Sequence, residues 1–125
     1  MPHQITFDRE KGVALLRMWG ELTPGEVRET VTEALAEPLV ANAPLSLVDL
    51  REVTSVAALR VEDIRSVAAG RLPESSRLAI VAPDSAAFGL ARMFTALRNL
   101  KESQAKIGVF RTLIEAEGWL GAGAL

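Results

Sequence analysis

Thr54 and Ser55 place two hydroxyl groups where a short apolar strand is expected to lead into a helix, in the stretch LREVTSVAAL (50–59). A phosphate on either hydroxyl would meet the unpaired N–H groups and the positive dipole end of that helix, which stabilise negative charge. In loops, serine is more commonly a turn residue that hydrogen-bonds to the local backbone. The sequence therefore favours a structural role for Ser55 and leaves phosphorylation of Ser55 or Thr54 open as the alternative.

A second strand-to-helix junction, APDSAAFG (82–89), brings Asp84 and Ser85 to the start of another predicted helix. Helix N-termini bind anions through their free N–H groups. However, the sequence contains neither GxGxxG nor GxxxxGK followed by Ser or Thr, and the carboxylate of Asp84 would repel an anion. Helix capping by Asp84 or Ser85 is therefore favoured over phosphate binding.

Residue types that perform catalysis or bind metals are few. The chain has no cysteine, which excludes disulfides, thiolate metal sites and cysteine nucleophiles. Its single histidine, His3, is near the N-terminus, where chains fray, so a zinc site or a Ser-His-Asp triad lacks its parts unless His3 folds back. Glu62, Asp63, Glu115 and Glu117 fall on predicted polar helix faces, where carboxylates are solvated. We expect no enzyme activity, no metal and no cofactor.

Length and charge restrict the class of protein. A chain of 125 residues is one domain by length, 1–125, and its net charge of −2 offers no electropositive surface to nucleic acid. The segment MPHQITFDRE lacks the features of a signal peptide, and no apolar run approaches the roughly 20 residues of a membrane span. The expectation is a cytoplasmic domain with no nucleic-acid partner, no integral membrane segment and a flexible tail at 121–125.

The pattern of apolar residues predicts the fold class. QITFD (4–8), the turn REKG (9–12) and VALLRMW (13–19) predict a hairpin. Segments with strand and helix character then alternate, with strands at 45–50, 77–83 and 106–110 and helices at 60–70, 86–100 and 112–120. Because such alternation gives parallel strands joined by crossover helices, we predict a single α/β domain with a five-stranded, mostly parallel mixed sheet and about four helices.

The first predicted helix carries clear end signals. Thr23 has the residue type of an N-cap, Pro24 suits the first helical position, and Glu26 suits the reciprocal partner of a capping box. Pro38 marks the expected end of the helix.

The helix predicted at 86–100 has an unusually wide apolar face. The residues expected to face the sheet are Phe88, Ala91, Phe94 and Leu97. Those expected to lie beside this face are Ala86, Leu90 and Met93. Such a face is covered by the domain's own core, by a second subunit or by an apolar ligand, and the core is the usual case. Gly89 costs up to about 1 kcal/mol relative to Ala in a helix, so we expect close packing at this position.

Two stretches, RLAIVAPDSAAFGLARMFTAL (77–97) and VFRTLIEAEGWL (109–120), resemble the SpoIIAA-like family. These small bacterial proteins are related to the sulfate-transporter and anti-sigma-factor-antagonist (STAS) domains and, more distantly, to the CRAL-TRIO lipid-binding domains. The resemblance runs from about residue 5 to residue 120 and implies a mixed sheet flanked by helices.

One motif of the anti-sigma-factor antagonists is absent. They carry an Asp-Ser-Ser-Gly-type motif with a phosphorylated serine at the start of the second helix, whereas this chain reads SVAAL (55–59), with alanines roughly where Asp and Ser would stand.

The expected function is a non-enzymatic binding module for a hydrophobic small molecule or lipid. The alternative is a STAS-type protein–protein interaction module without this motif, with a protein partner or as a homodimer. The candidate ligand- or partner-binding residues are Ser55, Val56, Leu59, Ser85, Leu90, Met93 and Phe94.

Overall fold

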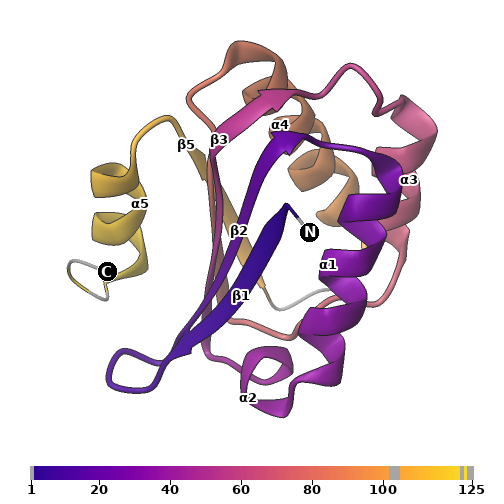
Figure 1. Ribbon diagram of the computed structural model, residues 1–125. Helices are drawn as coiled ribbons and strands as arrows, with labels where there is room; N and C mark the ends of the chain where they lie inside the picture. Colours follow the sequence, from indigo (N-terminus) through magenta and orange to yellow (C-terminus); the bar gives the residue numbers. More distant parts are fainter. Residues whose placement is uncertain (1, 102–104, 122, 124–125) are drawn as a thin grey trace.

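The computed structural model describes residues 2–101, 105–121 and 123 (Figure 1). Within them the strands are β1 (His3–Asp8), β2 (Val13–Glu21), β3 (Leu45–Ser55), β4 (Arg77–Val81) and β5 (Lys106–Phe110). They form one five-stranded sheet in the order β1-β2-β3-β4-β5, in which β1 is antiparallel to β2 and the other neighbours are parallel. The predicted α/β class and mixed sheet are confirmed.

Five helices accompany the sheet in the described residues: α1 (Pro24–Ala36), α2 (Pro38–Ala41), α3 (Val61–Ala69), α4 (Ser85–Arg98) and α5 (Leu113–Leu120). Parallel strands that neighbour one another in sequence order, joined by crossovers of the same hand, place their connecting helices on one face. Figure 1 shows α1, α3 and α4 on one side of the sheet and α5 on the other. None of these helices has the length and apolar character needed to cross a membrane.

The hairpin forms where the sequence predicts it. Backbone N–H of Gly12 donates to the carbonyl of Asp8 at 2.8 Å, which closes the turn between β1 and β2. Gly12 has a φ of +66°, a conformation that favours glycine over residues with a Cβ. The register pairs Asp8 with Val13 and His3 with Met18, so His3 lies in the β ladder instead of fraying.

The start of α1 follows the predicted cap, and the helix ends just before Pro38 as predicted. Thr23 Oγ1 accepts a hydrogen bond from the Glu26 N–H at 3.2 Å, and Pro24 is the first helical residue. The carboxylate of Glu26, expected to close a capping box, instead hydrogen-bonds to His3. Pro38 marks the end of α1, which stops at Ala36, and it also begins the one-turn helix α2, because proline fits the first helical position.

Strand β3 is longer than the predicted strand at 45–50. It continues to Ser55 because β2 extends to Glu21 and pairs with it, with Gly20 opposite Val53 and Glu21 opposite Ser55. Helix α3 begins only at Val61. Ser55 is therefore the last residue of a strand, and the expected placement of its hydroxyl at a helix N-terminus is wrong.

Side chains alternate between the two faces of the sheet and build a core on each. On the side of α1, α3 and α4, the buried apolar strand residues are Ala14, Leu16, Met18, Leu50, Val53 and Ile80. On the α5 side they are Val13, Leu47, Ala79 and Val81, which pack against Ala116 and Leu120. Gly121 ends α5 with a φ of +74°. Residues 122, 124 and 125 of the predicted flexible tail lie outside the described residues.

Candidate functional site

A cavity of about 890 Å³ lies between the sheet and the three crossover helices. Its floor consists of inward-facing strand residues, which include Leu16, Met18, Val48, Leu50, Leu78 and Ile80. Its walls include Val27 and Val31 of α1, Ile64 and Val67 of α3, and Leu90 and Phe94 of α4. The lining is mainly apolar, which is typical of pockets for small molecules.

The arrangement of the helices explains why this space exists. Helix α1 contacts β1 at one side of the sheet, whereas α4 contacts β5 and β3 toward the other. Helix α3 is held mainly by α4 (Figure 1). The small residues Ala87 and Ala91 are buried and let α4 approach the sheet closely. Parts of β2 and β3 between these supports therefore form the cavity floor.

Four of the predicted site residues line the cavity: Val56, Leu59, Leu90 and Phe94. Val56 and Leu59 belong to the segment between β3 and α3, and both are half-buried against the core. Leu90 and Phe94 are four residues apart on α4 and therefore share one face of that helix. The structure brings these four apolar side chains together around one space.

The other three predicted site residues, Ser55, Ser85 and Met93, are not part of the cavity lining. Ser55 Oγ accepts a hydrogen bond from the N–H of Ala57 at 3.1 Å, which is the local turn role that its sequence context favours. Ser85 is exposed as the first residue of α4. Met93 is half-buried on α4.

In and next to the predicted helix at 86–100, the structure adds to the sequence-based predictions at one residue and contradicts them at another. Asp84, and not Ser85, caps α4, with its Oδ2 accepting from the N–H of Ala87 at 3.1 Å. At Gly89, a Cβ would meet nothing within 4 Å, so the predicted close packing there is wrong. The interior of the helix therefore carries a glycine for which the fold has no steric requirement.

Polar groups gather in the lining near the amino ends of the parallel strands, and sequence analysis missed them. The hydroxyls of Ser46 and Ser75, both buried, hydrogen-bond to each other. Thr30 Oγ1 donates to the carbonyl of Glu26 at 2.8 Å. The alternation of β3 was a usable signal for Ser46, because it places Ser46 on the same face as Val48.

Two cations of the lining join the C-terminal ends of α3 and α4. Arg98 Nη1 donates to the carbonyls of Ala68 and Gly70, both at 2.8 Å. Lys101 Nζ donates to the carbonyl of Ala69 at 2.8 Å. The last carbonyls of a helix have no partner within the helix, and cations stabilise this negative end of the dipole.

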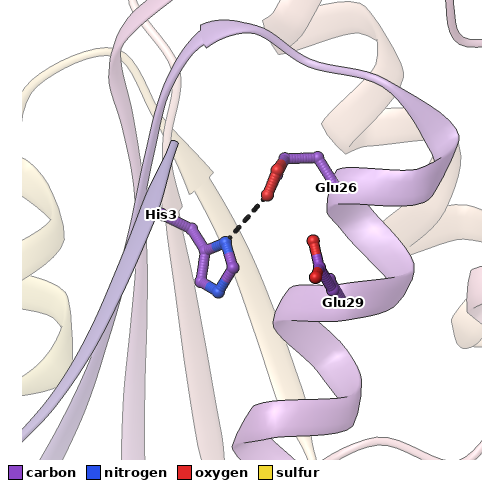
Figure 2. A group of neighbouring side chains, drawn as sticks. All are labelled: His3, Glu26 and Glu29. Atoms are coloured by element: carbon purple, nitrogen blue, oxygen red, sulfur yellow. Dashed lines mark hydrogen bonds and ion pairs between the residues drawn. The ribbon is translucent and has the colours of Figure 1, made fainter. Parts of the chain in front are cut away.

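His3 forms a separate polar cluster with α1, shown in Figure 2. Its Nδ1 lies 2.9 Å from Oε1 of Glu26, and its Nε2 lies 2.8 Å from Oε2 of Glu33. Burial lowers the pKa of His3, but the hydrogen bonds and negative charges of Glu33 and Glu26 raise it by more, so this pKa is above its ordinary value of 6.5. The expectation that His3 frays at the terminus is wrong, because two acids distant in sequence hold it.

The same cluster has the ligand types of a metal site. Ligand atoms of His3, Glu26 and Glu29 lie within 4.8 Å of one another. A metal ligand must be an unprotonated imidazole nitrogen, whereas both nitrogens of His3 are positioned to donate to carboxylates. The arrangement is explained by an ion-pair network that fastens β1 to α1.

A charged pair lies on the α5 face of the sheet. Arg51 donates to Asp49 through Nε at 3.0 Å and through Nη2 at 2.9 Å. Burial raises the pKa of Asp49, but the hydrogen bonds from Arg51 lower it by more, so it is below its ordinary value of 3.8. The adjoining cavity has a volume of about 160 Å³, less than the roughly 300 Å³ of a small-molecule pocket. This pair serves to position Arg51 on the sheet surface.

No protein-family model matches the chain, and no curated protein or solved structure is significantly similar to it. The cavity is therefore the feature of this chain that points to a function.

Proposed function

We propose that this protein is a non-enzymatic, cytoplasmic binding module of the SpoIIAA-like type that holds a hydrophobic small molecule or lipid. The ligand would occupy the cavity between the sheet and helices α1, α3 and α4. The observation that carries the proposal is the size of this cavity together with its mainly apolar lining.

The size of the cavity suits a small molecule. Its volume of about 890 Å³ lies within the range of about 300–1,000 Å³ that is typical of small-molecule pockets. The cavity is partly open to solvent, so a ligand can enter it.

The lining favours an apolar occupant over water. A buried water needs about 2–4 polar partners. The buried hydroxyls of Thr30, Ser46 and Ser75 already have hydrogen-bond partners in the protein. Among the described residues, no buried side-chain nitrogen or oxygen is left without a partner. Apolar atoms of a ligand would bury surface against Leu16, Leu50 and their neighbours without breaking these bonds.

The corner at 55–59 distinguishes this proposal from a STAS-type interaction module. Docking through the corner needs its apolar side chains at the surface. Val56 and Leu59 instead contribute to the cavity lining and are half-buried. The ligand-binding role is therefore the one that the position of these side chains favours.

Native mass spectrometry of the gently purified full-length chain, followed by titration with the neutral fluorescent probe N-phenyl-1-naphthylamine, tests the proposal. We expect a monomer that retains extra mass or takes up the probe at one site. A bare dimer that takes up no probe would favour the interaction module. A bare monomer without probe binding would contradict the proposal as well.

A further inference from the structure

The cavity is apolar over most of its length and cationic at one end. Among the described residues, the charged side chains in its lining are Arg71, Arg98 and Lys101, with Glu74 as the single acid. They belong to the segment after α3 and to the end of α4, near the amino ends of the parallel strands. This local excess of positive charge contrasts with the chain's net charge of −2.

Two of the three cations contact one short segment, and the third directly follows that segment in the chain. Arg98 donates hydrogen bonds to the carbonyls of Ala68 and Gly70, and Lys101 donates one to the carbonyl of Ala69. Arg71 follows Gly70 directly in the chain. The backbone hydrogen bonds place Arg98 and Lys101 at the C-terminal end of α3, and Arg71 lines the cavity from the segment that follows this end.

These cations keep donors for a ligand. A guanidinium has five N–H donors and an ammonium has three, so the carbonyl bonds occupy only some of them. Arg71 is exposed and forms no hydrogen bond or ion pair within the described part of the chain. Its side chain is therefore available to pair with a negatively charged group.

The opposite end of the cavity is apolar, and the distance between the ends suits a chain-like ligand. Leu22, Val56 and Leu59 line the cavity at the carboxyl ends of the strands. Along β2 and just beyond it, the lining runs from Leu16 to Leu22, which is about 20 Å at roughly 3.3 Å per residue. One leaflet of a bilayer, which one lipid chain spans, has a hydrocarbon thickness of about 15 Å, half of roughly 30 Å.

We propose that the ligand is a single-chain amphiphile with an anionic head group, a carboxylate or a phosphate. Its hydrocarbon chain lies along β2 and β3, and its head group is bound by Arg71 together with Arg98 and Lys101. This inference rests on the proposed binding function and adds the charge and orientation of the ligand.

Displacement of N-phenyl-1-naphthylamine from the full-length protein tests the inference. The competitors are oleate, oleyl phosphate and the uncharged oleyl alcohol, each below the concentration at which it forms aggregates. Hydrogen bonds to charged groups are stronger than those between uncharged groups. We therefore expect one or both anions to bind with an affinity roughly tenfold or more above that of the alcohol. The comparison of oleate with oleyl phosphate identifies the head group.

Arg71→Gln is the decisive variant, because its replacement disturbs no hydrogen bond or ion pair among residues 2–101, 105–121 and 123. We expect it to lower the affinity for the preferred anion by roughly tenfold and to leave the affinity for oleyl alcohol unchanged. Arg92→Gln, an exposed arginine of α4 outside the cavity lining, is the matched control and should change neither.

Two results would overturn the inference in distinguishable ways. If the alcohol binds as tightly as both anions and Arg71→Gln changes nothing, the head-group site is wrong while the apolar binding function stands. If the wild-type protein binds neither the fluorescent probe nor any of the three amphiphiles, the inference and the proposed function fail together.

Discussion

His3 of β1 and Glu26 of α1 are joined by a 2.9 Å contact between Nδ1 and Oε1, although they are 23 positions apart in the chain. A second contact from the same ring, to Glu33, makes both ring nitrogens donors to carboxylates. The edge strand is thereby attached to the helix that forms one wall of the cavity. The protonation state of one side chain then matters for the stability of the domain.

Stability should depend on pH through His3. Its pKa is raised in the folded protein, so the charged form is favoured by folding, and its contribution is fully present below the unfolded value of 6.5. The contribution is lost as pH rises through the higher folded pKa. We expect His3→Gln to lower the free energy of unfolding by about 1.5–3 kcal/mol at pH 6, and by less at pH 9.

Urea denaturation of both proteins between pH 5 and pH 9 measures this effect. The difference between wild type and His3→Gln should shrink with rising pH. A difference that stays constant, or grows toward pH 9, would show that the imidazolium is not what joins β1 to α1.

Filling the cavity should abolish ligand uptake. Leu90→Trp adds a large ring to a side chain that lines the cavity, whereas Met93→Trp makes a comparable change on the same helix outside the lining. We expect Leu90→Trp to lower the affinity for N-phenyl-1-naphthylamine at least tenfold and Met93→Trp to retain it. Equal loss in both variants, or loss only with Met93→Trp, would place the binding surface elsewhere on α4.

Two glycine substitutions should change stability in opposite directions. At Gly108, a Cβ would come within 2.7 Å of the Phe110 ring and 3.3 Å of Trp119, whose rings are packed with centroids 5.5 Å apart. We expect Gly108→Ala to destabilise the protein by about 1–3 kcal/mol, as overpacking does.

Gly89→Ala is the counterpart. Gly89 is within α4, and a Cβ at this position would meet no atom within 4 Å. The substitution should stabilise the protein by up to about 1 kcal/mol, the difference in helix propensity. Thermal and urea denaturation of both variants measure these changes. A destabilised Gly89→Ala would mean that another surface approaches α4 at this position.

Replacement of Ser55 should have only a local effect. Its hydroxyl accepts one hydrogen bond, from the N–H of Ala57. Ser55→Ala should therefore cost about 0.5–1 kcal/mol of stability and leave the affinity for the fluorescent probe unchanged. Loss of probe binding in this variant would contradict the local role and show that Ser55 takes part in ligand binding.

Local patterns in the sequence predicted most of the fold. The alternating strand at 4–8, the cap at Thr23 and the alternation of strands with helices are set by neighbouring residues, and the structure confirms them. The length of β3 was not predictable in this way. Its last residues are in a strand only because Glu21 of β2 lies opposite Ser55.

Local patterns likewise predicted only some residues of the candidate site. Leu90 and Phe94 were predicted because their helical spacing defines an apolar face, and both line the cavity. The approach of Arg98 and Lys101 to the end of α3 depends on how two helices pack, which no local pattern encodes. The partners of His3 were missed for the same reason, since Glu26 and Glu33 are contacts of the tertiary structure.

The strand order β1-β2-β3-β4-β5 has a consequence for how the chain reaches its native state. Every strand pairs with the strand that precedes it in the chain, so each addition to the sheet closes only a loop of moderate length. Topologies dominated by contacts near in sequence fold faster than those that need distant pairings. The hairpin and α1, already linked through His3, can form a first unit onto which each later strand and helix adds in turn.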